Sequence, residues 1–243
     1  QGSKRRGANM GILSVDHPDI LDFISCKNSP EKFTNFNISV AVTDKFMNCV
    51  LKNKKYDLID PRTKEVVKNL SARAVFEMIV NNSWSAGDPG LIFIDKINKL
   101  HSLYDKIEAT NPCGEQPLLP YESCVLGSVN LVNFIKNNEI DWDGIKKTVY
   151  VGVHFLDNVI DANDYVVKEI EEITKANRKI GLGVMGWADM LLQLGIPYDS
   201  KEALKLGEKV MHFISKNSKE ASRKLGKKRG DFPNFKSSKL KKY

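Results

Sequence analysis

The pattern of hydrophobic and polar positions divides the chain into a first half that mixes strands with helices and a second half that is mostly helical. Apolar residues alternate with other residues over 36–42, which is typical of a strand. In the second half, apolar residues recur at helical spacing over 142–160 and 201–225, and Asp141 and Ser200 precede these segments as N-caps. The pattern therefore predicts an α/β fold that ends in long helices.

Shorter elements complete the first half. The same reasoning predicts short strands at 11–15 and 91–94, a hairpin at 56–67 and a helix at 20–24. It also predicts a helix that ends at about residue 51, capped by Thr43 or Asp44, and a helix at 72–86, capped by Ser71. No repeat and no linker-like stretch interrupts the sequence. We therefore expect residues 1–243 to form a single unit.

The composition narrows the class of protein. The chain has 243 residues, of which 42% are hydrophobic and 28% charged, so it can bury a core and is not disordered. No apolar run approaches the roughly 18 residues of a membrane span, so we expect no membrane association. Four scattered cysteines without a C-x-x-C pair, and four histidines without ligand spacing, favour reduced thiols, no metal and a cytoplasmic location.

The net charge of +7 has two interpretations. A positive field attracts polyanions such as nucleotides or nucleic acid. Alternatively, the excess reflects lysine-rich faces exposed to solvent. The second interpretation is favoured because much of the excess lies in two runs, over 224–229 and 236–242.

The most informative segment for chemistry is the pentapeptide Asn-Pro-Cys-Gly-Glu at 111–115. In an extended chain, Asn111, Cys113 and Glu115 would share one face. The intervening proline and glycine suit a loop better than a central strand. An amide, a thiol and a carboxylate together could hold and attack a small hydroxylated molecule. The alternative is a turn whose cysteine is merely buried.

Two further segments invite comparison with known motifs. Cys124 follows Cys113 by eleven residues and could exchange electrons with another thiol, although alone it is typical of a core residue of the strand predicted at 125–131.

The second segment is the glycine run at 181–186, which matches G-x-G-x-x-G. A dinucleotide site requires a strand before that motif, and the preceding apolar run is too short. Close packing through small residues is the favoured interpretation.

Residues 111–124, which read N-P-C-G-E-Q-P-L-L-P-Y-E-S-C, closely resemble the finger loop of ribonucleotide reductase catalytic subunits. The form is most similar to the adenosylcobalamin-dependent (class II) enzymes. Segments 5–13, 35–40, 87–90 and 178–186 also resemble family segments, in family order. The resemblance implies part of a ten-stranded α/β barrel, with Cys113 on a central finger loop. The N-terminal and C-terminal family segments are absent, so this central fragment is expected to be inactive alone.

The resemblance also implies roles for individual residues. Cys113 would become a thiyl radical and remove the 3′ hydrogen of the ribose, and Glu115 would take the 3′-hydroxyl proton. Asn111 would bind the sugar hydroxyls, and Cys124 would be one of two thiols that end as a disulfide. The implied substrate-binding positions are Ala8, Asn111, Pro112, Cys113, Gly114 and Glu115.

The activity that the resemblance implies is reduction of ribonucleotides to 2′-deoxyribonucleotides for DNA precursor synthesis. Ribonucleoside diphosphates are favoured as substrates over triphosphates. The resemblance also implies adenosylcobalamin as cofactor, a thioredoxin-like dithiol as reductant and dNTP or ATP as effectors. It implies assembly either as a homodimer or with complementing chains of a split enzyme. One alternative is a class I subunit supplied by a separate metal-radical protein. The other is a basic nucleic-acid-binding module, which does not explain the Asn-Cys-Glu pattern.

Overall fold

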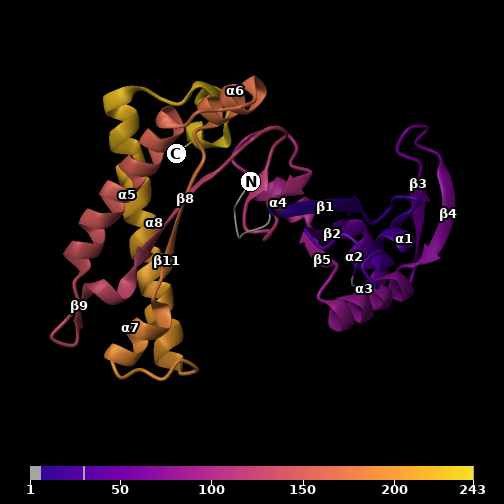
Figure 1. The fold of residues 1–243 in the computed structure, drawn as a ribbon, viewed down its shortest axis with the longest axis horizontal. Helices are drawn as coiled ribbons and strands as arrows, with labels where there is room; N and C mark the ends of the chain where they lie inside the picture. The colour runs from indigo at the N-terminus through magenta and orange to yellow at the C-terminus, as the bar shows by residue number, and fades with distance from the viewer. Residues whose placement is uncertain (1–6, 30, 243) are drawn as a thin grey trace. The chain divides into compact units, whose positions relative to one another are not determined.

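The computed structural model describes residues 7–29 and 31–242, so Arg5 and Arg6 of the segment quoted above lie outside the described residues. The chain divides into two compact units, residues 1–120 and 121–243, which are described separately (Figure 1). That both units belong to one domain stays a prediction from the sequence. Among the described residues, no helix combines the length and the apolar character that spanning a bilayer requires.

The first unit is built on a parallel three-stranded sheet. Its strands are β1 (Asn9–Ser14), β2 (Phe36–Val42) and β5 (Gly90–Phe93), in the order β1-β2-β5. The bounds of β2 confirm the predicted strand. Residues 38–42 are buried in succession, not alternately, because the central strand of a parallel sheet is covered on both faces.

Three helices pack their apolar residues against this sheet: α1 (Ile20–Ser25), α2 (Asp44–Leu51) and α3 (Ala72–Ala86). Thr43 caps α2 by accepting a hydrogen bond from the Phe46 amide at 3.1 Å, and Ser71 caps α3 in the same way. Between α2 and α3 lies the predicted hairpin, formed by β3 (Lys55–Ile59) and β4 (Val66–Ser71). After β5 come α4 (Ile94–Leu100), which the sequence did not predict, and the two-residue strands β6 (Ala109–Thr110) and β7 (Pro117–Leu118).

The second unit pairs two long helices with a two-stranded parallel sheet. The helices α5 (Trp142–Ala162) and α8 (Lys201–Arg229) run side by side (Figure 1), and the strands are β8 (Val125–Asn130) and β11 (Ile180–Met185). Asp141 and Ser200 cap the two helices as predicted, at 2.8 and 3.0 Å from the amides they bind. The core holds the following buried side chains: Leu131, Ile145, Val149, Val153, Met190, Val210, Ile214 and Ala221.

Smaller elements connect these parts of the second unit. They are η1 (Leu131–Phe134), β9 (Ile135–Lys136), β10 (Glu139–Ile140), α6 (Lys168–Asn177), α7 (Trp187–Gln193), η2 (Pro233–Ser237) and η3 (Lys239–Lys242). α6 and η2 pack against each other, and Asn234 of η2 donates a hydrogen bond to the Asn177 side chain at the end of α6 at 2.7 Å.

The glycine run is itself a strand, β11, and does not follow one. It forms because each residue from Ile180 to Met185 pairs in parallel with β8. Gly186 then adopts φ +71°, and a Cβ atom there would lie 2.2 Å from the Asn130 Oδ1 atom. Small residues therefore allow close packing here, as the sequence predicted, and a dinucleotide site is not needed to explain them.

Arg178 joins α6 to α5. Its Nε atom lies 2.8 Å from Asp157, and two further guanidinium nitrogens each lie 2.8 Å from Asp161. The hydrogen bond from Arg178 holds the pKa of the Asp161 carboxyl below its ordinary value.

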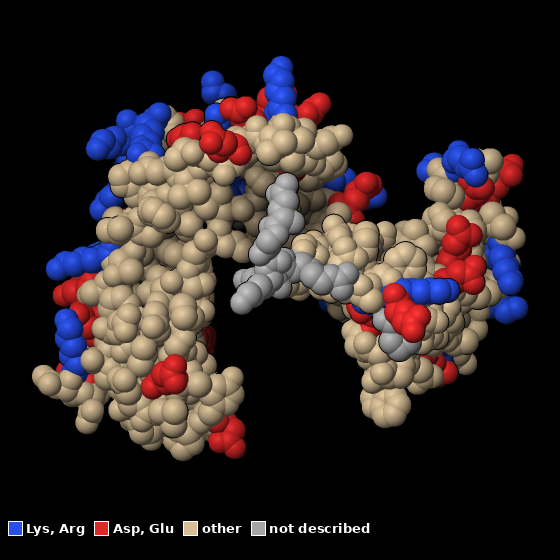
Figure 2. Space-filling view, in the orientation of Figure 1, with Lys and Arg blue, Asp and Glu red and all other residues tan. Residues whose placement is uncertain are grey.

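Two residues of the basic run at the end of α8, Lys224 and Arg229, are engaged within the unit. Arg229 binds Asp157, Asn158 and His154, each at 2.7 Å. Lys224 lies 3.2 Å from Glu220. Figure 2 shows Lys and Arg side chains gathered at the upper left, where α8 ends, with few Asp or Glu side chains among them. These contacts give Lys224 and Arg229 a structural use within the second unit.

Replacing Gly186 by alanine is expected to destabilise the second unit more than the same change at Gly195. Both glycines have positive φ, +71° and +69°, which costs an alanine about 1 kcal/mol. Only Gly186 also meets a neighbouring atom, so Gly186→Ala should cost about 2 kcal/mol more. Urea unfolding of the complete protein measures the difference, and equal midpoints for the two variants would contradict the packing described for Gly186.

Arg178→Met should lower the free energy of unfolding by about 2 kcal/mol at pH 7, since charged hydrogen bonds to two carboxylates are lost. Asp161 has a lowered pKa in the folded state, so its stabilising contribution is complete above about pH 3.9, the unfolded value, and disappears as pH falls through the folded value. The gap between parent and variant should therefore narrow in acid. A constant gap from pH 7 to pH 2, measured by urea unfolding, would contradict this assignment.

Candidate functional site

Residues 111–116 form the tip of a small hairpin between β6 and β7. The Asn111 amide donates to the Gln116 carbonyl at 3.1 Å, and the Gly114 amide donates to the Asn111 carbonyl at 3.0 Å. Pro112 thus occupies the second position of a four-residue turn, and Gly114 adopts φ +84°. The predicted loop is confirmed. The backbone from Asn111 to Glu115 is turned and not extended, so these residues do not alternate along one face of a strand as the sequence suggested.

The Asn111 side chain closes the loop from inside. Its Oδ1 atom accepts a hydrogen bond from the Gln116 amide at 2.9 Å. On the preceding residue, the Thr110 hydroxyl donates to the Asn111 carbonyl at 3.0 Å. Asn111 therefore uses its amide oxygen and its backbone to hold the loop.

The next residues lie on the outside of this loop. Cys113, Gly114 and Glu115 are all exposed in the first unit. A Cβ atom added at Gly114 would meet no atom within 4 Å, so open space adjoins the turn. The alternative of a turn with a merely buried cysteine is therefore wrong for this unit, and the thiol and the carboxylate are both accessible.

Asn37 fixes the hairpin tip to the sheet, and the sequence did not identify it. Its Nδ2 atom donates to the Pro112 carbonyl oxygen. Asn37 is the register partner of Met10 in β1, and Ala8 immediately precedes that strand. Ala8 and the tip therefore lie at the same end of the sheet, where β1 and β2 begin. A polar residue within a parallel strand was the available signal.

Cys124 lies in the second unit, half-buried, immediately before β8. None of the four cysteines forms a disulfide. Burial raises the pKa of the Cys26 thiol above its ordinary value.

Two residues before Cys124, the fully buried Glu122 side chain lies 2.6 Å from the Lys179 ammonium and accepts a hydrogen bond from the Asn177 side chain at 2.9 Å. Nothing in the sequence indicated that this carboxylate is buried, because its partners lie 55 and 57 residues away.

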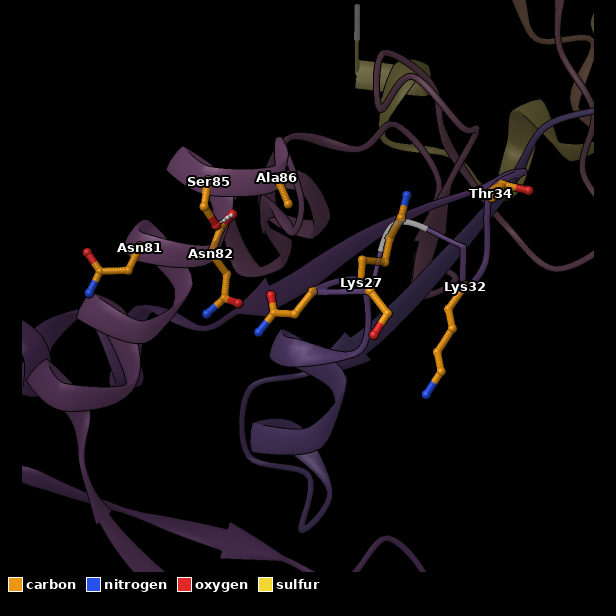
Figure 3. A pocket seen from close by; sticks show the side chains of 9 residues that line it. Lys27, Lys32, Thr34, Asn81, Asn82, Ser85 and Ala86 are labelled. Carbon is orange, nitrogen blue, oxygen red and sulfur yellow. Dashed lines mark hydrogen bonds between the residues drawn. The ribbon is translucent and has the colours of Figure 1, made fainter.

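A separate cavity of about 670 Å³ lies beside the C-terminal part of α3 (Figure 3). Lys27 and Lys32 contribute to one side of it, and Asn82 and Ser85 of α3 contribute to the other. The Lys27 ammonium is already bound at 2.6 Å to both Asp88 and the Phe36 carbonyl. The residues that line the cavity carry amide, hydroxyl and ammonium groups but no thiol and no carboxylate, so we place the candidate site at the hairpin tip.

Metal ligands do not gather anywhere in the part of the chain that the structure describes. Within residues 7–29 and 31–242, no three histidine, cysteine, aspartate or glutamate side chains are arranged to hold an ion. The polar groups at the hairpin tip are the Asn111 amide, the Cys113 thiol and the Glu115 carboxylate.

Comparison with known proteins shows a match over the whole chain. Residues 1–243 match the family model described as the barrel domain of ribonucleotide reductase. A protein of Thermoplasma acidophilum named vitamin B12-dependent ribonucleoside-diphosphate reductase is 53% identical over 237 residues, which cover 96% of this chain and 31% of that protein. A Mycobacterium tuberculosis protein of the same name is 47% identical, over 98% of this chain and 34% of its own length.

More distant relatives carry other names. A ribonucleoside-diphosphate reductase subunit alpha of Chlamydia trachomatis is 30% identical over 98% of this chain and 26% of its own length. The chain thus spans about a quarter to a third of the length of these curated relatives. The two parallel sheets, neither of which closes, agree with a partial barrel.

Asn111→Ala should loosen the hairpin tip, because the Gln116 amide loses its side-chain acceptor. One hydrogen bond contributes about 1 kcal/mol, so hydrogen exchange at Gln116 should become several-fold faster. Asn111→Asp keeps an acceptor oxygen at the same place and is the matched control. Mass-spectrometric exchange on the complete protein measures both variants, and equal protection of Gln116 in the parent and the alanine variant would contradict the described role.

Proposed function

Because this chain belongs to the family of ribonucleotide reductase barrel domains, we propose that it forms part of a catalytic subunit that reduces ribonucleoside diphosphates to 2′-deoxyribonucleoside diphosphates. Such a reaction supplies DNA precursors and would take place in the cytoplasm. Its first support is the match over residues 1–243, and the names of the most similar relatives specify diphosphates. The observation that carries the proposal is the exposed Cys113 thiol on a loop anchored to the sheet by Asn37.

Cys113 acts as the hydrogen-abstracting group. As a thiyl radical it removes the hydrogen atom from the 3′ carbon of the ribose, which converts the thiyl back to a thiol and leaves a radical on the sugar. An accessible sulfur suits this step, since the S–H bond breaks and reforms readily. The anchored turn limits the motion of the sulfur and so favours a fixed geometry of attack.

Glu115 and Asn111 act on the hydroxyl groups of the same sugar. The exposed Glu115 carboxylate accepts the 3′-hydroxyl proton, which helps the 2′-hydroxyl leave as water. The Asn111 oxygen holds the Gln116 amide, so the role left for its Nδ2 group is to donate to a sugar hydroxyl. We assign Ala8, Pro112 and Gly114 to contacts with the substrate, since they lie at the same end of the sheet and the space beside Gly114 is open.

The reaction consumes two electrons and two protons. Two thiols supply them and end as a disulfide, while the ribonucleotide becomes a deoxyribonucleotide and water. Cys124 is one of these thiols, and we assign the second to no cysteine of this chain. An external dithiol of the thioredoxin type then restores the reduced state.

The accessible thiol at the hairpin tip fits a reaction that begins with a radical from a bound cofactor. When bound, adenosylcobalamin supplies that radical by homolysis of its cobalt–carbon bond. Cys113 is the residue of this chain that receives it, and its exposure on the turn meets that requirement. We assign no residue of this chain to holding the corrin ring.

Two alternatives receive less support. The relatives that are 53% and 47% identical are named vitamin B12-dependent, which favours adenosylcobalamin over a separate metal-radical subunit. A nucleic-acid-binding module would use the basic run of α8, but Lys224 and Arg229 are engaged with neighbouring side chains.

We further propose that dNTP or ATP effectors regulate the enzyme, and that the chain assembles as a homodimer or with complementing chains.

Cys113→Ser should abolish formation of deoxycytidine diphosphate by the complete enzyme, supplied with cytidine diphosphate, adenosylcobalamin and dithiothreitol. Glu115→Gln should lower kcat about 100-fold or more, as expected for loss of a general base. Cys49→Ser, a half-buried cysteine within α2, is the matched control and should retain the parent rate. Product chromatography measures all three.

The same assay distinguishes the radical sources. Omission of adenosylcobalamin should remove all activity from the parent enzyme. Substantial product from Cys113→Ser, or undiminished product without adenosylcobalamin, would contradict the proposed function.

A further inference from the structure

We propose that the buried ion pair between Glu122 and Lys179 positions Cys124 for electron delivery, an inference that rests on the proposed function. The Glu122 side chain has 0% of its surface exposed, and that of Lys179 has 24%. Taking a carboxylate out of water costs several kcal/mol unless it is paired and hydrogen-bonded. The carboxylate therefore requires an arrangement that satisfies both of its oxygens.

The partners of Glu122 provide that arrangement. One oxygen lies 2.6 Å from the Lys179 ammonium, and the other accepts a hydrogen bond from Asn177 at 2.9 Å. Asn177 is in turn held by Asn234, whose Nδ2 atom donates to its Oδ1 atom at 2.7 Å. The carboxylate is thus tied to the end of α6, to the start of β11 and, through Asn177, to η2.

Ser123 adds a second attachment at the next residue. Its hydroxyl lies 2.8 Å from the hydroxyl of Thr174 on α6, and its amide donates to the same oxygen at 3.3 Å. Thr174 is almost completely buried. Two successive residues are therefore fixed immediately before Cys124.

The residue that follows Cys124 is fixed as well. Val125 begins β8 and pairs in parallel with Ile180 of β11. Lys179 immediately precedes Ile180, as Cys124 precedes Val125, so the two residues occupy neighbouring positions at the start of paired strands. Cys124 is held between the strand ladder on one side and the Glu122–Ser123 attachment on the other.

Stability alone does not explain such a pair. A buried ion pair is weak evidence for stability, because apolar residues of similar volume often replace one with no loss. A thiol that must meet a second sulfur and form a disulfide of strict geometry does require a fixed backbone. We therefore assign the pair to positioning and not to folding.

The pair also sets the charge beside Cys124. Removing the carboxylate leaves one more net positive charge, which favours the thiolate, and removing the ammonium has the opposite effect. Other charged groups on the neighbouring elements are paired with one another, as Glu171 is with Lys175, Lys168 with Glu172, and Arg178 with Asp157 and Asp161. Glu169 of α6 and Lys236 of η2 are exposed.

The test uses the complete enzyme with adenosylcobalamin and dithiothreitol. The double variant Glu122→Met, Lys179→Met buries no charge and fills a similar volume, so we expect it to fold with an unchanged urea midpoint. Its kcat should fall at least tenfold, while the KM for cytidine diphosphate stays within twofold. Lys179→Arg keeps the positive charge and should retain at least a third of the parent kcat.

Two single changes give a signature that a purely structural role would not produce. At pH 8, Glu122→Gln should speed alkylation of Cys124 by iodoacetamide several-fold, and Lys179→Met should slow it. Glu171→Gln removes an exposed ion pair on α6 and is the matched control, with no expected effect on either measurement.

Several outcomes would overturn the proposal. Parent-like kcat in the double variant, a change confined to KM, or alkylation rates that do not move in opposite directions would each do so. If the double variant and Glu122→Gln both fail to fold while Lys179→Arg folds, the pair is a folding element and the proposal is wrong. Cys124→Ser separates the two levels of inference. Suppose that the parent enzyme makes deoxynucleotide, that Cys124→Ser makes none, and that the Glu122 and Lys179 variants stay fully active. The positioning role of the ion pair is then wrong, while the proposed function of Cys124 stands.

Discussion

The contact between Asn37 and the Pro112 carbonyl is the constraint on which the candidate site depends. Without this contact, only hydrogen bonds within the six-residue loop would hold it, and the reactive sulfur would be less firmly fixed to the sheet. Asn37 connects the tip to the central strand of a parallel sheet, and the Asn111 side chain closes the loop beneath it. The sheet thereby supplies the rigidity that the exposed Cys113 lacks.

Buried polar groups perform a related task in the second unit. Glu122 and Ser123 bind α6 and the start of β11, and the parallel pairing of β8 with β11 continues from there. The ion pairs of Arg178 and Arg229 join α5 to α6 and α8. In both units, a cysteine of proposed function follows residues that are fixed by hydrogen bonds to more distant parts of the chain.

Features that depend on local sequence could be predicted. The bounds of β2, the caps at Ser71, Asp141 and Ser200, and the loop at 111–116 follow from neighbouring residues. For α2 the sequence left Thr43 and Asp44 as alternatives, and Thr43 is the cap. Features that depend on pairing partners could not. The glycine run forms a strand only because β8 lies beside it, and α6 has few apolar residues by which to recognise it.

The candidate site shows the same division. The residue types of 111–115 indicated the chemistry, but the assumption of an extended backbone was wrong because Pro112 and Gly114 form a turn. The roles of Asn37 and Glu122 could not be found from sequence spacing, because their partners are distant in the chain. Pro112 lies 75 residues from Asn37, and Lys179 lies 57 residues from Glu122. The most direct test of the central claim is turnover of cytidine diphosphate deuterated at the 3′ carbon by the complete enzyme. Abstraction by Cys113 predicts a slower rate than with the unlabelled substrate, whereas identical rates in single-turnover experiments limited by chemistry would contradict it.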